Sequence, residues 1–174
     1  SDGSTDKTVQ IAQETGVDVI ALSKNRGKGG ALSVGVKSCS ADVLVFLDAD
    51  LIGLQKKHVV NLIKPVIKNK AEMSIGVFVN GKMATDLAQK ITPFLSGQRV
   101  LKRKLFDAID CIDISKDGVE ILLTKYVKEN NIKCVKVELD SVSHVTKEEK
   151  LGLIKGLNAR IKMYYDIVKS VFGL

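Results

Sequence analysis

The sequence predicts an α/β protein with a mostly parallel sheet and helices on both of its faces. Two observations support this. Short apolar runs alternate with segments of helical spacing along the chain, an order typical of parallel sheets. Several apolar runs also end abruptly in acids or in glycine-rich turns. Because parallel sheets bind ligands at the carboxyl ends of their strands, the residues that follow each run are the first candidates for a functional site.

Composition places the chain among folded globular proteins. Its 174 residues are enough for one domain with a real core, and we expect a single domain over residues 1–174. No run approaches the roughly 18 uncharged apolar residues of a membrane span. The net charge is +7, but the lysines are spread out and aromatics make up only 5%, which argues against nucleic acid as a partner. Three scattered cysteines without disulfide or zinc spacing fit a reducing cytoplasm.

The first half of the chain reads as two helix–strand pairs. Ser4, Thr5 and Asp6 are typical residues for the start of a helix, which would run toward Gly16. The run "VDVIAL" (residues 17–22) predicts a short buried strand. The glycine-rich "NRGKGG" then opens a second helix, and "DVLVFLDADL" is the strongest strand signal, an apolar run that stops at acids.

The second half continues the alternation. We predict helices over residues 55–70, 82–92, 117–131 and 146–174, and strands over residues 72–79 and 132–145. Residues 95–106 are expected to form a loop and a basic short helix. Within the first of these helices, Pro65 predicts a kink and His58 is expected to be solvated. The helix over residues 146–174 is amphipathic; we expect it to dock on the sheet, and contact with an anionic membrane is the alternative.

Asp48 and Asp50 form the centre of the predicted site. Side chains repeat every second position in a strand, so both carboxylates point the same way from the strand end. Two like charges this close repel unless a cation lies between them. Mg²⁺ or Mn²⁺ prefers oxygen ligands and takes one or two carboxylates together with substrate phosphate. The alternative is a solvated acidic turn.

Other polar residues follow the remaining strands. Lys28 lies in a glycine-rich turn at a helix start, where backbone amides and a cation favour an anion, although the spacing is not that of a P-loop. His144 ends the last strand, and imidazole is a common metal ligand. Glu120 lies early in an otherwise apolar helix. Arg99 and the basic run of residues 102–104 are candidates for an anionic acceptor. Each of these has a structural or surface alternative.

The motifs "DGSTDKT", "NRGKGGAL", "VLVFLDADL", "LSGQR" and "GVEILL…VELDSVSH" occur in this order. The set resembles family 2-like glycosyltransferases with the GT-A fold, and most of all the relatives of dolichol-phosphate mannosyltransferase and glucosyl-3-phosphoglycerate synthase. The resemblance runs from Asp2 to about Lys150. It implies a Rossmann-like sheet that, in this chain, lacks the first strand and helix of the family. One family acid is also replaced, by Ser1.

The resemblance also implies roles for individual residues. Asp2, Lys28, Asp48 and Asp50 would bind a UDP- or GDP-sugar donor. Asp50 would be the principal ligand of Mg²⁺ or Mn²⁺, with His144 as a second metal ligand.

On the acceptor side, the resemblance assigns the segment Ser96, Gly97, Gln98 and Arg99 to binding an anionic or polyprenyl-phosphate acceptor. Glu120 would lie near the sugar and is the candidate base, so Glu120 and Asp50 are the catalytic candidates.

The function expected is metal-dependent transfer of a hexose from a nucleotide sugar to a phosphate-bearing or lipid-linked acceptor. This activity would lie in the cytoplasm or at the inner face of the membrane, and a homodimer stays open. Without the first strand and helix, the 174-residue piece is expected to be poorly active. Two alternatives remain: a non-catalytic nucleotide-sugar binding or scaffold module, and a sugar-phosphate nucleotidyltransferase.

Overall fold

A computed structural model describes residues 1–79, 96–110 and 118–144 of the chain. The helices predicted over residues 82–92 and 146–174 lie outside this part. In the described residues, no helix is both long enough and apolar enough to cross a lipid bilayer.

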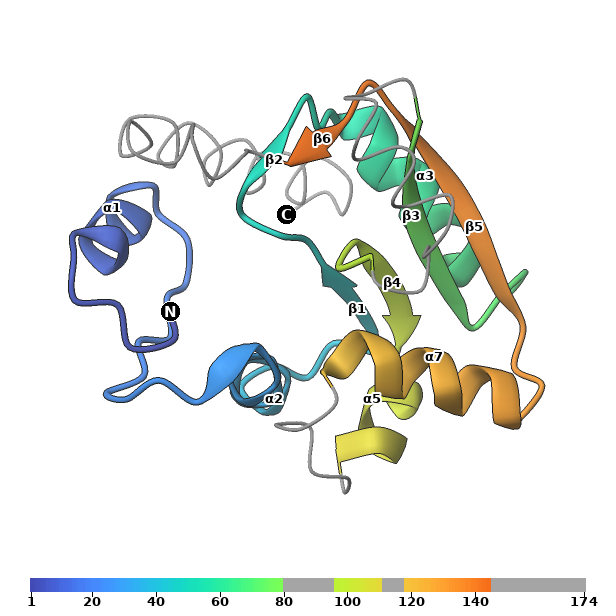
Figure 1. Cartoon of the computed structure of the whole chain (residues 1–174), viewed down its shortest axis with the longest axis horizontal. Coiled ribbons are helices and arrows are strands. Elements are labelled where there is room, and N and C mark those ends of the chain that lie inside the picture. The colour runs from blue at the N-terminus through green and yellow to red at the C-terminus, as the bar shows by residue number, and fades with distance from the viewer. Residues whose placement is uncertain (80–95, 111–117, 145–174) are drawn as a thin grey trace.

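The central sheet has four strands in the order β1-β4-β3-β5. The strands are β1 (Val43–Phe46), β4 (Arg99–Lys102), β3 (Met73–Val79) and β5 (Cys134–Asp140). β3 pairs in parallel with β5, whereas β4 is antiparallel to both of its neighbours, β1 and β3. Three strands therefore run in one direction, as the sequence predicts, around one reversed strand (Figure 1).

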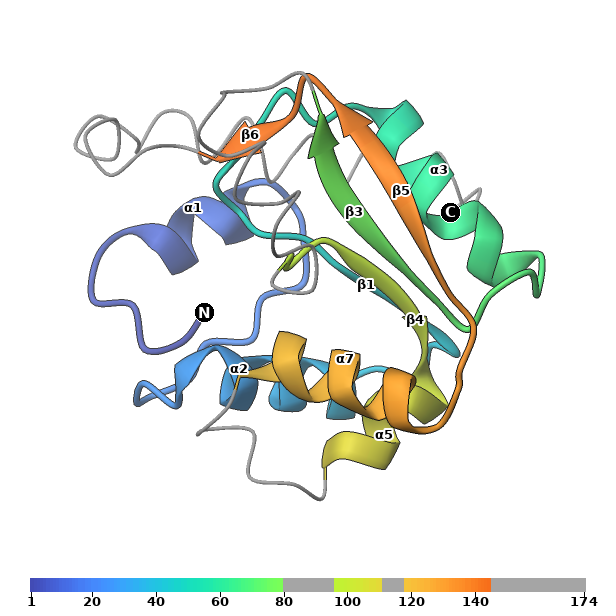
Figure 2. The same cartoon turned by 45° about the vertical axis from the view of Figure 1, so that its right-hand side comes forward.

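Helices cover both faces of this sheet. α3 (Lys56–Ile67) packs against β3, β4 and β5 on one face. α2 (Gly27–Lys37), α5 (Arg103–Asp110) and α7 (Val119–Glu129) lie on the other, as the turned view in Figure 2 shows. Val100 and Leu101 are neighbours on β4 and are both fully buried, one in each of the two hydrophobic clusters. This alternation is the strand periodicity expected of a sheet buried on both sides.

The strand predicted over residues 17–22 does not form. α1 (Thr8–Glu14) precedes it as expected, with the Asp6 carboxylate accepting a hydrogen bond from the Thr8 amide at 3.0 Å. The segment itself has no regular structure. Backbone hydrogen bonds join it to Ser1, which donates to the Ile20 carbonyl at 2.7 Å and accepts from the Leu22 amide at 2.9 Å. A ladder needs a neighbouring strand, and one residue does not supply it.

A small second sheet joins two distant loops. β2 (Leu51–Ile52) pairs antiparallel with β6 (Ser143–His144), and the register places His144 opposite Leu51. Gly53 makes the approach possible, because a Cβ there would collide with the carbonyl oxygen of Ser141, and its φ of +77° suits glycine. This pairing brings the backbone of His144 next to the turn that follows β1.

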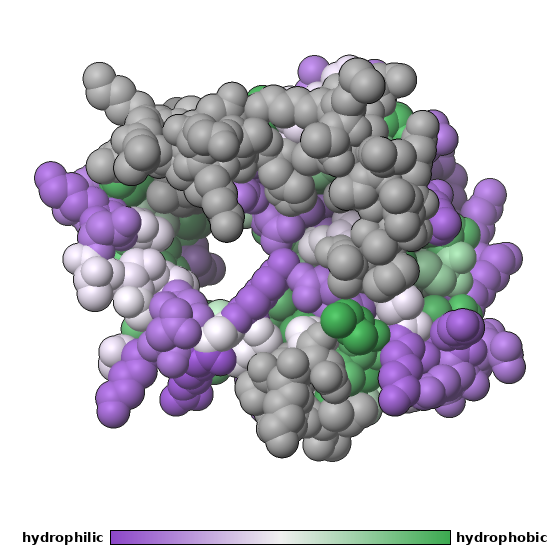
Figure 3. All heavy atoms as spheres, viewed as in Figure 1, coloured by the Kyte–Doolittle hydropathy of each residue, from purple (hydrophilic) through white to green (hydrophobic). Residues whose placement is uncertain are grey.

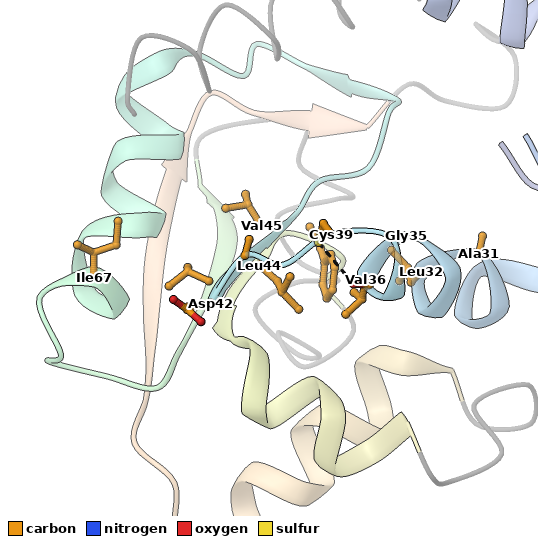
Figure 4. Close-up of a pocket in the computed structure, with 12 residues that line it drawn as sticks. Ala31, Leu32, Gly35, Val36, Cys39, Asp42, Leu44, Val45 and Ile67 are labelled. Atoms are coloured by element: carbon orange, nitrogen blue, oxygen red, sulfur yellow. Dashed lines mark hydrogen bonds between the residues drawn. The ribbon is translucent and has the colours of Figure 1, made fainter. Parts of the chain in front are cut away.

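A groove of ≈ 900 Å³ runs between α2 and the edge of β1 that faces away from β4. Its lining is almost entirely apolar, with Leu32 and Val36 on α2, Leu44 on β1 and Ile67 beyond Asp42 (Figure 4). It holds no set of polar groups that fits a phosphate or a sugar, so the candidate site lies elsewhere.

His58 is buried rather than solvated, with 3% of its surface exposed. Its Nδ1 accepts a hydrogen bond from the Gln55 amide at 3.1 Å, and the two residues form a capping box at the start of α3. Its Nε2 is buried without a hydrogen-bond partner among the described residues. Burial, followed by the charge of Lys57, lowers the pKa of His58, although Asp140 opposes the shift.

Acid is therefore expected to weaken the fold through His58. A histidine whose pKa is lower in the folded state contributes its stability above its unfolded pKa, near 6.5, and loses it as the pH falls through the folded value. We expect the free energy of unfolding to fall less between pH 7 and pH 5 in His58→Asn, which keeps an acceptor for the Gln55 amide, than in the wild type. Urea titrations at both pH values measure this difference, and equal decreases in the two proteins would contradict it.

Candidate active site

Three elements converge where β1 ends. Asp48 follows β1, Lys28 lies in the first turn of α2, and Glu120 lies in the first turn of α7. The Lys28 ammonium bonds Asp48 Oδ1 at 2.8 Å and Glu120 Oε1 at 2.5 Å. The structure thus brings together a predicted donor-binding lysine, one acid of the Asp-Ala-Asp motif and the predicted base.

The lysine keeps its charge at this position. Burial acts to lower the pKa of Lys28, but the hydrogen bonds and charges of Asp48 and Glu120 outweigh it, and the pKa is raised. Its side chain is still 51% exposed. An ammonium that is both anchored and accessible is suited to meet an anionic ligand.

The three residues share a small cavity whose lining also includes apolar side chains, among them Leu32, Phe46 and Leu123. Lys28, Asp48 and Glu120 line a cavity of ≈ 30 Å³ together with Gly97 and Arg99. That is room for a water molecule or an ion rather than a sugar. Figure 3 shows an opening in one face of the molecule, and hydrophilic residues form part of its border.

Gln98 holds Asp48 from the interior. Its side-chain oxygen accepts from the Asp48 amide at 2.9 Å, and its side-chain nitrogen donates to Asp48 Oδ2 at 2.8 Å. Gly97 lies directly against the same carboxylate, where an added Cβ would be 2.7 Å from Oδ1. The Gln98 side chain is fully buried.

Ser96 and Arg99 also turn inward. Ser96 donates from its hydroxyl to the Gly76 carbonyl at 2.7 Å. Arg99 is 1% exposed and donates from Nε to the Ser96 carbonyl and from one terminal nitrogen to Thr124 Oγ1 at 3.1 Å. Burial lowers the pKa of Arg99 to about 10, against the opposing charge of Glu120. These contacts tie β4 to α7, and an acceptor contact of the Ser96–Arg99 segment stays a prediction.

Asp2 packs against the turn that precedes α2. Its carboxylate accepts a hydrogen bond from the Arg26 amide at 2.6 Å, and its carbonyl accepts from the Asn25 side chain at 3.3 Å. Gly3 has a φ of +72° and lies so close to the Asn25 backbone that a side chain would not fit. Asp2 therefore supports the loop that carries Lys28, and its predicted donor contact stays untested.

Asp48 and Asp50 are the carboxylates that the turn after β1 offers to a divalent cation. Asp48 and Asp50 lie within one turn after β1, and the β2–β6 pairing brings the His144 backbone next to that turn. The described residues hold no group of three or more His, Cys, Asp or Glu side chains placed for a metal. Mg²⁺ and Mn²⁺ do not require such a group, because substrate phosphate and water complete their coordination.

The basic run after β4 has mainly structural contacts. Lys102 and Lys104 pair with Glu72 at 2.9 Å and 2.6 Å, and these charges lower the pKa of that carboxyl. Arg103 donates to the carbonyl oxygens of Val36, Cys39 and Ala41, at the end of α2. The sequence suggested that these basic residues bind an anionic acceptor. No local pattern in the sequence indicates that Arg103 bonds the end of α2.

The comparison that decides the family concerns more than half of the chain. A family model described as glycosyl transferase family 2 matches residues 1–117. The chain belongs to this family. The match includes Lys28, Asp48 and the Ser96–Arg99 segment, so these parts of the candidate site lie within the family region.

Two relatives match shorter segments of this family 2 chain. An uncharacterized protein of Methanocaldococcus jannaschii is 40% identical over 79 residues, which cover 43% of the chain and 32% of that protein. The human dolichyl-phosphate beta-glucosyltransferase is 45% identical over 56 residues, which cover 28% of the chain and 17% of the human protein. The matched segments thus span a third or less of either relative.

Solved structures support the fold of the family 2 chain. A glucosyl-3-phosphoglycerate synthase from Mycobacterium tuberculosis, in complex with phosphoglyceric acid, has a TM-score of 0.66 at 23% identity over 99% of this chain and 67% of that one. The same synthase with Mn²⁺, UDP-glucose and phosphoglyceric acid has the same score and identity over 95% of this chain and 66% of that one. The GT-A prediction is confirmed.

Proposed function

We propose that this chain transfers a hexose from a nucleotide-diphosphate sugar to a phosphate-bearing or lipid-linked acceptor, using Mg²⁺ or Mn²⁺. The observation that carries the proposal is the convergence of Lys28, Asp48 and Glu120 at the end of β1. The mycobacterial synthase is described with Mn²⁺, UDP-glucose and phosphoglyceric acid. Its similarity to this chain supports a donor and an acceptor of the same chemical classes here.

Asp50 and Asp48 are the residues that would hold the cation, with His144 as the further ligand that the sequence suggests. When bound, the cation neutralises negative charge on the departing nucleoside diphosphate. Lys28 adds a positive charge on the same side of the site. Because it is fixed by two carboxylates before the ligand arrives, it needs little reorganisation to interact with a diphosphate.

Glu120 has a role that depends on the acceptor. An acceptor hydroxyl must lose a proton as it attacks the sugar, and Glu120 is the carboxylate beside the site that can take it. An acceptor phosphate is already an anion and needs no such base.

The test is a screen of donors and acceptors on the purified protein. UDP-glucose, other UDP-sugars and GDP-mannose are each incubated with Mn²⁺ and with either phosphoglycerate or a polyprenyl phosphate, and release of nucleoside diphosphate is measured. We expect acceptor-dependent release from one donor class, loss of release on chelation, and recovery when Mn²⁺ is restored.

Three results would contradict this. Donor binding without turnover would indicate a binding module, and pyrophosphate release from a nucleoside triphosphate would indicate a nucleotidyltransferase. Turnover that survives chelation would remove the metal from the proposal.

A further inference from the structure

We propose that Gln98 is a positioning residue whose side-chain amide fixes the Asp48 carboxylate in the orientation that binds the cation–diphosphate group. The inference rests on the proposed function and assigns to Gln98 a task different from acceptor binding. Gln98 need not touch the substrate; it acts through Asp48.

The geometry of the contact is specific. Gln98 uses both ends of its amide on one residue, accepting from the Asp48 main-chain N–H at 2.9 Å and donating to Asp48 Oδ2 at 2.8 Å. The bond to the main-chain N–H fixes the backbone where β1 ends, and the bond to Oδ2 fixes the rotation of the Asp48 side chain. Partners of metal-binding carboxylates that orient them in this way are a general feature of metal sites.

The amide is held on a rigid support. The backbone carbonyl of Gln98 accepts from the Gly76 amide of β3 at 2.8 Å, and its own amide donates to the Ser96 hydroxyl at 3.3 Å. Its side chain is fully buried, so the rotamer is set by packing. The absence of a side chain at Gly97 lets the carboxylate lie against the main chain. Gln98 thus connects the end of β1 to the centre of the sheet.

The chemistry of an amide suits this task. Gln98 donates to Oδ2 while the Lys28 ammonium bonds Oδ1, so the two oxygens of Asp48 are held by different groups. A neutral donor leaves the negative charge of the carboxylate in place for a cation. A carboxylate at position 98 would repel Asp48 or share a proton with it.

Three substitutions separate these contributions. Gln98→Leu keeps most of the volume and removes both hydrogen bonds, and we expect the affinity for Mn²⁺ plus UDP, measured by calorimetry, to fall about 10- to 100-fold. Gln98→Glu keeps the length of the side chain but replaces the donating amide with a carboxylate that repels Asp48, so we expect it not to restore the affinity lost in Gln98→Leu. Gln98→Asn keeps the amide on a shorter side chain, and we expect it to restore part of the affinity lost in Gln98→Leu.

The matched control is Ser74→Ala. Ser74 is also fully buried, and its hydroxyl donates to the Leu62 carbonyl at 2.6 Å on the α3 side of the sheet. We expect this change to lower the Tm and to leave the affinity for Mn²⁺ plus UDP unchanged. Equal losses of affinity in Ser74→Ala and Gln98→Leu would show a general effect on folding and would overturn the proposal.

A second measurement needs no ligand. The Asp48 amide donates to Gln98, so its hydrogen exchange should become about tenfold faster in Gln98→Leu, while the β1 amides that pair with β4 keep their rates. Unchanged exchange at Asp48 would overturn the contact. Faster exchange with unchanged affinity would overturn the positioning role alone. If the wild-type protein binds no Mn²⁺ plus UDP, the proposed function is overturned, and the positioning role of Gln98 with it. The exchange rate of the Asp48 amide would still show whether Gln98 bonds Asp48.

Discussion

Asp50→Ala is expected to abolish sugar transfer, lowering kcat by about 100-fold or more. Asp50 lies in the turn after β1, two residues beyond Asp48, which Lys28 and Gln98 hold. If it is the principal ligand of the cation, its removal leaves the charge of the departing diphosphate without its main counter-charge. Donor release is measured at saturating Mn²⁺ and again at tenfold higher Mn²⁺.

Asp107→Ala is the matched control for this change. Asp107 is an exposed carboxylate on α5, and it has no part in the candidate site. Its removal changes the net charge by the same amount and is expected to leave kcat within about twofold of the wild type, as is usual for surface substitutions. Turnover in Asp50→Ala equal to that in Asp107→Ala would contradict the metal assignment.

Lys28→Met is the change with the second-largest expected effect. The wild-type ammonium bridges Asp48 and Glu120, so methionine leaves two carboxylates facing each other with no cation between them. A divalent cation can take that place, and we expect the affinity for Mn²⁺ alone to be kept or increased. The diphosphate of the donor nevertheless loses a positive partner, so kcat should fall about 100-fold.

The test is that Lys28→Met changes Mn²⁺ affinity and kcat in opposite directions. Calorimetry with Mn²⁺ alone measures the affinity, and release of nucleoside diphosphate from the donor measures kcat. Lys125→Met serves as the control, because Lys125 is an exposed residue of α7 whose partner, Glu129, lies 4.0 Å away. Loss of Mn²⁺ binding in Lys28→Met, or wild-type turnover, would contradict the role given to Lys28.

Local sequence signals were sufficient to predict where Asp48 and Lys28 lie in the fold. An apolar run that stops at an acid marks a strand end, and a glycine-rich turn marks a helix start near an anion site; the structure places both as these signals imply. Glu120 was singled out because it is a charged residue in an otherwise apolar helical segment. In the structure it lies in the first turn of α7 and pairs with Lys28.

The contacts that sequence reasoning missed are long-range. β4 is only four residues long and has charged residues at both ends, so it gives no alternating pattern. Its pairing with β1 nevertheless brings Gln98 to Asp48. The burial of His58 was missed for the same reason, since its lysine-rich surroundings in the sequence hide a neighbourhood supplied by other elements. Residues 17–22 carry a strand pattern, but no neighbouring strand pairs with them in the described part of the chain.

The bridge from Lys28 to Glu120 has a consequence for how the protein is made on the ribosome. The two residues are separated by more than half of the chain, so the ion pair closes only after α7 has emerged from the exit tunnel and docked. Nascent chains that end before Val119 have every strand from β1 to β4 but lack one arm of the bridge. The cluster of Lys28, Asp48 and Glu120 is thus completed only after α7 has been made and has docked, and a polypeptide stalled before that point would lack it.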